Sequence, residues 1–390
     1  IRKNILNQFH MEKYSQQKIE ILDTTLREGE QTPGISFSHK EKIKIAKMLN
    51  EFGADFIELG HPAVSKDIYK SINMISHMKL ESKKIVHSRL IKKDIDLAIE
   101  LKIPWVGLFI GTSNLCLKHK YQIGKDQLLR MIESNIKYCK DKGLKVRFTA
   151  EDSSRTNIIF LNKVAYLAQK SGADRFSFAD TVGILRPLKM QKIIKSLKYE
   201  IDIPIHVHCH NDFGLATANS LAAIESGAQC IDTTINGLGE RCGLPPLAEI
   251  TAALSKLYKI KNNWDLGMLK NISDYIDEIT GMGKKNIRPI TGDNAFTHKA
   301  GLHVNSILKD PSCYEAITPK FLNRDRKILI DKYSGKANIK HKLNKLGICL
   351  SESKIENLLI SIKSKPSTTN WTDEMIISTI KQIDKLSLNK

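Results

Sequence analysis

Three histidines at alternate positions form the most distinctive chemical feature of the sequence. His206, His208 and His210 lie in and just after a short apolar run, and Asn211 and Asp212 follow them. Strand side chains alternate between faces, so the three imidazoles share one face. Two imidazoles and one carboxylate can bind a divalent metal and leave coordination positions open for a substrate. A cluster of hydrogen-bonded core histidines is the structural alternative.

The carboxylate that could complete such a metal site lies near the start of the chain. Residues 23–31 follow another short apolar run and contain Arg27 and Glu28. We expect Glu28, His208 and His210 to hold a divalent metal; zinc, magnesium and manganese all suit this set. The metal would act as a Lewis acid on a carbonyl group, and Arg27 would stabilise the developing negative charge on its oxygen. A surface ion pair is the alternative role for Arg27.

These side chains can meet only in a fold that brings distant segments to one edge. The sequence alternates apolar runs with amphipathic segments. Strands are expected at residues 19–22, 56–59, 84–87, 105–110, 145–149, 174–178, 204–207 and 229–235. Helices are expected at residues 38–52, 65–77, 92–101, 125–141, 158–171, 188–198, 216–227 and 246–257. This alternation predicts an α/β fold, a (β/α)8 TIM barrel.

Polar residues stand at the carboxyl ends of the expected strands. A TIM barrel gathers these ends on one face, where its active site lies. The residues expected there are Arg27, Glu28, His61, Arg89, Ser113, Glu151, Thr181, His208, His210 and Asn236. The barrel would therefore place the histidines of the seventh strand beside the glutamate of the first.

The rest of the chain predicts further divisions. Residues 1–17 form a polar and basic tail, and residues 18–264 form the barrel. Residues 265–330 form a linker region, and residues 331–390 form a small, mainly helical C-terminal subdomain. Helices are expected at residues 269–280, 336–346, 352–363 and 371–386.

Composition limits the classes of function. The formal charge of +19 is compatible with nucleic acid, a membrane surface or acidic substrates, but basic residues are spread along the chain without a dense block. We therefore expect anionic small molecules and no nucleic acid. The seven cysteines contain no Cys-x-x-Cys pair, which is typical of reduced thiols in a cytoplasmic protein. No apolar run approaches the length of a membrane span, and no secretory signal is visible.

Eight stretches, in order and at family spacing, resemble the α-isopropylmalate synthase and homocitrate synthase family. The stretches are Leu-Arg-Glu-Gly-Glu-Gln (26–31), Gly-His-Pro-Ala-Val-Ser (60–65), His-Ser-Arg (87–89), Val-Arg-Phe-Thr-Ala-Glu-Asp (146–152), Ala-Asp-Thr-Val-Gly (179–183), His-Cys-His-Asn-Asp (208–212), Asn-Gly-Leu-Gly-Glu-Arg-Cys-Gly (236–243) and Thr-His-Lys-Ala-Gly-Leu-His (297–303). The resemblance implies a metal-dependent Claisen condensation of acetyl-CoA with a 2-oxo acid. It extends from about residue 18 to about residue 363.

Within that family the residues most resemble the enzymes that make homocitrate from 2-oxoglutarate, as the first step of lysine biosynthesis by the aminoadipate route. Glu28 stands where isopropylmalate and citramalate synthases usually carry Asp. Asn236 stands where isopropylmalate synthases carry Asn and several homocitrate enzymes carry an aliphatic residue. Synthesis of 2-isopropylmalate from 2-oxoisovalerate, or of citramalate from pyruvate, therefore remains the alternative. Related lyases and aldolases generally lack the region around His303.

The resemblance also implies roles for individual residues. The catalytic set is Arg27, Glu151, His303 and Tyr314; the substrate set is His87, Arg89, Ser113 and Thr181; and the acetyl-CoA set is Gly237, Gly239, Glu240 and Arg241. Arg89 is expected to bind the distal carboxylate of 2-oxoglutarate, because a planar guanidinium suits bidentate recognition. A structural ion pair is its alternative, as a turn cap is for Thr181. In the family His303 and Tyr314 come from the neighbouring subunit's linker region, which implies a domain-swapped homodimer.

Overall fold

The computed structural model describes residues 17–283, 285–365 and 370–388. The expected tail at residues 1–17 lies outside this part of the chain, apart from its last residue. The chain divides into two compact units, one up to residue 284 and one from residue 285.

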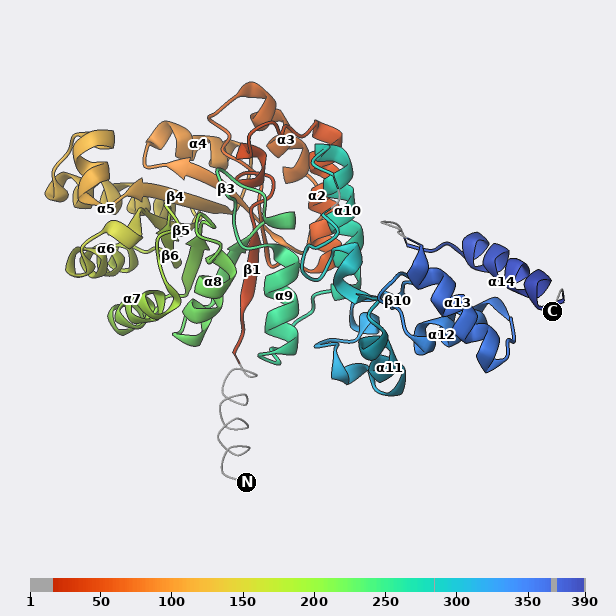
Figure 1. Cartoon of the computed structure of the whole chain (residues 1–390). Helices are drawn as coiled ribbons and strands as arrows, with labels where there is room; N and C mark the ends of the chain where they lie inside the picture. Colours follow the sequence, from red (N-terminus) through yellow and green to blue (C-terminus); the bar gives the residue numbers. More distant parts are fainter. Residues whose placement is uncertain (1–16, 284, 366–369, 389–390) are drawn as a thin grey trace. The chain divides into compact units, whose positions relative to one another are not determined.

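The first unit is built on eight parallel strands that close into a barrel in sequence order (Figure 1). The strands are β1 (Glu20–Asp23), β2 (Phe56–Glu58), β3 (Lys83–Arg89), β4 (Trp105–Gly111), β5 (Lys145–Glu151), β6 (Arg175–Asp180), β7 (Ile205–Cys209) and β8 (Cys230–Thr233). The ring closes where β1 pairs with β8, from Glu20 opposite Cys230 to Asp23 opposite Thr233. The predicted TIM barrel is confirmed.

Helices follow the strands and cover the barrel. They are α2 (His39–Phe52), α3 (Lys66–Ser76), α4 (Lys92–Glu100), α5 (Lys125–Asp141), α6 (Ile158–Lys170), α7 (Pro187–Glu200), α8 (Ala216–Glu225) and α9 (Leu247–Lys256). Helix α2 begins at a capping box, in which the Ser38 hydroxyl accepts from the amide of Glu41 and the Glu41 carboxylate accepts from the amide of Ser38. Its inner face buries Ile45, Leu49 and Phe52 completely. Each such side chain stabilises the fold by about 1.5–3 kcal/mol.

Two elements of the first unit differ from the expectation. A π-helix, η2 (Cys116–Tyr121), follows β4. Strand β8 ends at Thr233, before the expected residue 235, because the chain turns into the 3-10 helix η4 (Ile235–Gly237) with Asn236 at a φ of 59°. Helix α10 (Leu269–Thr280) has the expected bounds and packs against α2 and η4 of the first unit.

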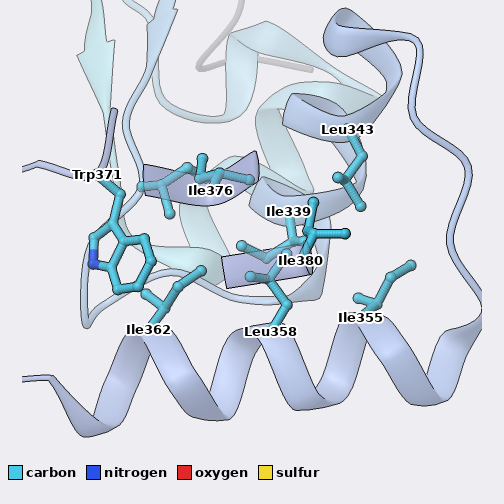
Figure 2. Packing of buried hydrophobic residues seen from close by; sticks show 9 residues of the cluster. Ile339, Leu343, Ile355, Leu358, Ile362, Trp371, Ile376 and Ile380 are labelled. Atoms are coloured by element: carbon cyan, nitrogen blue, oxygen red, sulfur yellow. The ribbon is translucent and has the colours of Figure 1, made fainter. Parts of the chain in front are cut away.

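The second unit is mainly helical, with one short parallel strand pair. Its elements are β9 (Thr297–His298), α11 (Gly301–Lys309), β10 (Lys327–Ile328), α12 (Lys336–Leu346), α13 (Glu352–Ser364) and α14 (Asp373–Leu388). Figure 2 shows Leu358 and Ile362 of α13 pointing toward Ile339 of α12 and Ile380 of α14, with Trp371 at one end of the cluster. The expected helices at 336–346 and 352–363 are confirmed; α11 was not expected. No helix in the described residues is long and apolar enough to cross a membrane.

Candidate active site

Glu28, His208 and His210 meet at the carboxyl ends of the barrel strands. One ligand atom from each residue lies within 4.8 Å of the other two, and all three residues are buried. Nε2 of His210 lies 3.8 Å from Oε1 of Glu28. The ring closure between β1 and β8 accounts for this meeting, because it brings the segment after β1 next to the end of β7.

Asp232 orients one of these imidazoles from the interior of the barrel. Its Oδ2 accepts a hydrogen bond of 3.1 Å from Nδ1 of His208, which leaves Nε2 of His208 as the ligand nitrogen. Burial acts against the charge of Asp232, but Arg147, His206 and His208 outweigh it and hold the pKa well below its usual value. Asp232 is therefore an ionised acceptor at neutral pH.

The donor set fits a divalent cation. Nδ1 of His210 is buried without a hydrogen-bond partner among the described residues. Burial lowers the pKa of His210 to about 3, and the His208 charge adds to this effect, so the imidazole is neutral, as a metal ligand must be. Burial raises the pKa of Glu28, but Arg27 and the two histidines outweigh it and keep the carboxylate ionised.

Arg27 is fixed beside this group by two carboxylates. Its Nε donates to Oε2 of Glu58 at 2.7 Å, and its Nη1 contacts Oε2 of Glu28. Thr24 also donates to Oε2 of Glu58, at 2.6 Å. Burial raises the pKa of Glu58, but Arg27 and Arg147 outweigh it and hold the pKa well below the usual range. The Arg27 guanidinium is thus held in place before any substrate binds, as electrostatic stabilisation requires.

A buried ion network continues below Arg27 across the barrel. Arg147 donates from Nη2 to Glu58 at 3.0 Å and from Nη1 to Asp232 at 3.1 Å. The Arg147 side chain is 1% exposed, and its Nε has no partner in the described part of the chain. Because Glu58 also holds Arg27, and Asp232 also holds His208, this network links both sides of the candidate metal site.

One cavity of about 250 Å³ adjoins these groups. The expected site residues that line it are Arg27, Glu28, His61, His87, Glu151, Thr181, His208, His210, Glu240 and Arg241. Residues that line it without having been predicted include Gln31, Phe109, Arg147, Thr149 and Asp232. The cavity is smaller than a typical pocket for a drug-sized ligand, which is about 300–1,000 Å³, and so suits a small acid.

Arg89 does not line this cavity, contrary to the expectation. Its guanidinium forms a fork on Asp94 of α4, with Nε at 2.6 Å and Nη2 at 3.1 Å, and its side chain is 53% exposed. Arg89 is the last residue of β3, one inward position above His87, so it reaches the outer rim of the barrel. The structure therefore shows the ion pair that was the alternative for Arg89.

Ser113 also lies outside the cavity lining. Its hydroxyl donates to the carboxylate of Asp152 and accepts from the amide of Cys116 at 3.2 Å. Ser113 is buried and both of its bonds stay within the loops after β4 and β5. This residue supports the shape of those loops instead of facing a substrate.

His87, His61 and Thr181 do face the cavity. The His87 ring stacks on Phe109 with 4.2 Å between centroids, and burial lowers the pKa of His87 to about 4. The His61 ring makes a T-shaped contact with both of these rings. The Thr181 hydroxyl accepts from the amide of Asp152 at 2.9 Å, which leaves its own proton available to a ligand.

The glycine loop after β8 packs against the candidate metal site. A β carbon at Gly243, where φ is 77°, would lie 1.8 Å from the carbonyl oxygen of Gly237. A β carbon at Gly239 would lie 3.4 Å from Cγ of Glu28. The amide of Glu240 lies 3.4 Å from Oε1 of Glu28. The glycines thus allow the backbone to approach a metal-ligand candidate closely.

Arg241 ties this loop to the loop after β7. It donates from Nε and Nη2 to Asp212, at 2.8 and 2.9 Å, and from Nη2 to the carbonyl of Thr181 at 2.6 Å. Its guanidinium is therefore already engaged by protein groups. The Asn236 side chain points away from the cavity and bonds to Ser273 and Asp277 of α10.

His303 and Tyr314 lie together in the second unit. Their rings stack with centroids 4.1 Å apart and planes inclined by 28°, and Tyr314 is half exposed. Glu315 follows and is held by a fork from Arg326, with bonds of 2.6 and 2.7 Å. The expected association of this pair with a partner subunit's site stays a prediction.

Sequence reasoning missed Glu58, Arg147 and Asp232, although a signal was present. Each belongs to a strand: Glu58 is the last residue of β2, Arg147 the third of β5 and Asp232 the third of β8. Strands of a parallel barrel are buried on both faces, so a charged residue in one of them must find a partner inside. The sequence shows that charged residues stand in these strands, but it does not show which of them pair with one another.

Two family models match successive parts of the chain. Residues 18–276 match the HMGL-like model, and residues 290–369 match the model described as homocitrate synthase post-HMGL domain-like. A homocitrate synthase from Sulfurisphaera tokodaii is 45% identical over 361 residues, which cover 91% of this chain and 78% of that protein. A homocitrate synthase from Pyrococcus horikoshii is 45% identical over 351 residues, which cover 90% of this chain and 96% of that protein. This chain belongs to the homocitrate synthase family.

Solved structures with the same barrel have distant sequences. The hydroxymethylglutaryl-CoA lyase from Pseudomonas aeruginosa gives a TM-score of 0.63 at 18% identity, over 72% of this chain and 97% of that one. The carboxyl transferase domain of Rhizobium etli pyruvate carboxylase with oxalate gives 0.55 at 17% identity, over 74% and 52%. These likenesses concern the fold alone.

Proposed function

We propose that this chain is a metal-dependent homocitrate synthase, an acyltransferase that condenses acetyl-CoA with 2-oxoglutarate to give homocitrate and CoA. The observation that carries the proposal is the 45% identity with homocitrate synthases over nine-tenths of the chain. The geometry supports it, because a candidate metal site, a fixed arginine and a buried second arginine adjoin one cavity. Asn236, the residue that favoured isopropylmalate synthesis, points out of that cavity.

Glu28, His208 and His210 would hold the divalent cation, which when bound supplies Lewis-acid polarisation of the oxo-acid carbonyl. Charge supports this role. Arg27 and Arg147 carry two positive charges, and Glu28, Glu58 and Asp232 carry three negative ones, so this group alone has one net negative charge. A divalent cation reverses that sign and so favours an anionic substrate. Arg27 would donate to the carbonyl oxygen as negative charge builds up on it.

The two carboxylates of 2-oxoglutarate would have separate partners. Thr181 would donate its free hydroxyl proton to the carboxylate next to the carbonyl. Arg147, rather than Arg89, would face the distal carboxylate, because Arg147 lines the cavity and its Nε has no partner among the residues that the structure describes. The neutral His87 stacked on Phe109 would form one wall.

Carbon–carbon bond formation requires removal of a methyl proton from acetyl-CoA. Glu151 is one candidate base, since it lines the cavity, and His303 with Tyr314 is the other. The C–H electron pair then attacks the ketone carbon, and hydrolysis of the thioester releases CoA. Gly237, Gly239, Glu240 and Arg241 would form the loop beside acetyl-CoA, with Arg241 acting through its bonds to Asp212.

We further propose a cytoplasmic homodimer in which residues 265–330 of each chain complete the site of its partner, and a role at the start of lysine biosynthesis. Sedimentation equilibrium tests the dimer: the expected mass is twice 44.1 kDa. A monomer that is fully active would contradict shared sites.

The proposed reaction is tested by CoA release, measured with a thiol reagent. Purified protein is supplied with acetyl-CoA, a divalent metal and one of 2-oxoglutarate, 2-oxoisovalerate or pyruvate. We expect 2-oxoglutarate to be used at least about tenfold faster, because only it offers a distal carboxylate to Arg147. The Glu28→Ala variant is the inactive control. Equal or faster turnover of 2-oxoisovalerate would overturn the substrate assignment.

A further inference from the structure

The π-helix η2 brings two polar side chains to Glu151, one of the residues that line the cavity. π-helices are rare and occur frequently at functional sites. Here the element follows β4 and ends with Lys120 and Tyr121. The next residue, Gln122, leaves the helix in the left-handed region, with a φ of 55°. The chain therefore turns sharply just after presenting these two residues.

Gly111 fixes η2 against the end of β4. A β carbon at Gly111 would lie 2.6 Å from Sγ of Cys116 and 3.2 Å from the Tyr121 ring, so a larger residue could not be accommodated without movement. The Gly111 amide donates to the Tyr121 hydroxyl at 3.2 Å. Both ends of η2 are thus attached to the strand that lies next to β5, where Glu151 is the last residue.

The result is a contact on both oxygens of Glu151. Nζ of Lys120 lies 2.8 Å from Oε1 and 2.8 Å from Oε2. The Tyr121 hydroxyl lies 3.3 Å from Oε2. Each carboxylate oxygen can accept about two hydrogen bonds. Oε2 has both positions filled by Lys120 and Tyr121, whereas Oε1 keeps one position open.

We propose that Lys120 is a positioning residue that, with Tyr121, orients the Glu151 carboxylate so that Oε1 accepts the methyl proton of acetyl-CoA. This inference rests on the proposed condensation. In the step, Oε1 gains the proton, the C–H electron pair forms the new bond to the ketone carbon, and the ketone π electrons move to its oxygen. Lys120 keeps its own proton throughout.

Lys120 is the cation that pairs with Glu151, because Arg147 and Arg241 are bound to other carboxylates. Among residues around the same cavity, Arg147 is bound to Glu58 and Asp232, and Arg241 to Asp212. The Glu151 carboxylate stabilises the charged form of Lys120: burial lowers the pKa of Lys120, but the hydrogen bond and charge of Glu151 outweigh burial and raise that pKa overall. Lys120 is half exposed, so the pair contributes geometry more than stability.

The test compares Lys120→Gln with a matched control, Lys140→Gln. Lys140 also pairs with a carboxylate, Asp174, at 2.7 Å and with similar exposure, but Asp174 precedes β6, at the other end of the barrel strands. We expect Lys120→Gln to lower kcat about 10–100-fold with the KM for 2-oxoglutarate unchanged, because a small displacement of a reacting group costs that much. Lys120→Arg should recover most of the loss, and Tyr121→Phe should lose less than Lys120→Gln.

Two further measurements separate this inference from the reaction itself. Loss of deuterium from methyl-deuterated acetyl-CoA should fall in Lys120→Gln and stay normal in Lys140→Gln. A carbodiimide should join Lys120 to Glu151 through an amide, detected by mass spectrometry whether or not the enzyme turns over. Absence of that cross-link, or equal kcat in the two variants, overturns the inference. A clear cross-link in a protein that releases no CoA with any oxo acid overturns the proposed function and leaves the Lys120 contact standing.

Discussion

Replacing Asp232 with asparagine tests the link between the barrel interior and the candidate metal site. Asp232 accepts from Nδ1 of His208 at 3.1 Å and from Nη1 of Arg147 at 3.1 Å. Asn has nearly the same shape and one acceptor oxygen, so the variant removes the charge with little change in packing. The imidazole of His208 then becomes a weaker ligand, since its Nδ1–H faces a neutral amide instead of a carboxylate.

The expected magnitude follows from the two partners of Asp232. Loss of an outer carboxylate typically weakens metal binding about 10–100-fold, which corresponds to about 1.4–2.7 kcal/mol. Arg147 keeps Glu58 as a charged partner and can still donate to the Asn oxygen. The loss of unfolding free energy should therefore stay below the roughly 3–5 kcal/mol of a fully broken buried ion pair.

Metal affinity is measured by competition with a chromophoric chelator, and stability by urea unfolding of the metal-free protein. The control is Asp180→Asn: Asp180 is also buried at the end of a strand, but its carboxylate accepts from the backbone amides of Ile184 and Leu185. An Asp232→Asn protein whose metal Kd stays within twofold of the unmodified protein would refute the role of Asp232. An equal loss in Asp180→Asn would refute its specificity.

Two other predictions follow from buried charges. Arg147→Lys should raise the KM for 2-oxoglutarate at least about tenfold in the CoA-release assay, because one ammonium cannot bind both Glu58 and Asp232 as the guanidinium does and also contact a substrate. The control Arg89→Lys should change that KM less than twofold. A larger rise in Arg89→Lys than in Arg147→Lys would show that Arg89 binds the distal carboxylate. Burial raises the pKa of the Asp23 carboxyl group to about 7 in the folded protein, whereas its pKa in the unfolded chain is near 3.8. The folded protein therefore loses stability as the pH rises from about 4 to about 7, and this loss is constant at higher pH. As the pH rises, Asp23→Asn should therefore become more stable relative to the unmodified protein, by up to about 4 kcal/mol at pH 8. The unfolding free energy of both proteins is measured in urea at pH 5 and at pH 8. A difference between the two proteins that is the same at both pH values would contradict this prediction.

Local sequence patterns predicted most of the helices and strands, because the formation of a helix or strand depends largely on residues that are close together in the chain. The helix at residues 125–141 has the predicted bounds, and the helix expected at residues 38–52 is present as α2, with Ser38 as its N-cap. The π-helix η2 was missed because its geometry depends on Gly111, whose lack of a β carbon lets Cys116 and Tyr121 pack against β4. No local periodicity carries that information.

Strand alternation predicted which side chains face into the barrel. It did not predict which ion-pair or hydrogen-bond partner each of these side chains has. His206, His208 and Asp232 all point into the barrel, as alternation requires, but His206 lies deeper, where it accepts from Arg175 and is not grouped with Glu28, His208 and His210. Arg89 and Arg147 both occupy inward positions of their strands. Arg89 finds Asp94 at the rim, and Arg147 finds Glu58 and Asp232 within the barrel.

The sequence by itself determined the barrel, the common face of the histidines and the family, because hydrophobic periodicity and the order of motifs can be read along the chain without knowledge of tertiary contacts. Only the tertiary structure decided which charges meet. The pairing of β1 with β8 brings Glu28 to His210, and the depth of each residue along its strand decides whether an arginine faces the cavity or the rim. Ion pairing depends on distances of a few ångströms between residues far apart in sequence, and those distances exist only once the ring has closed.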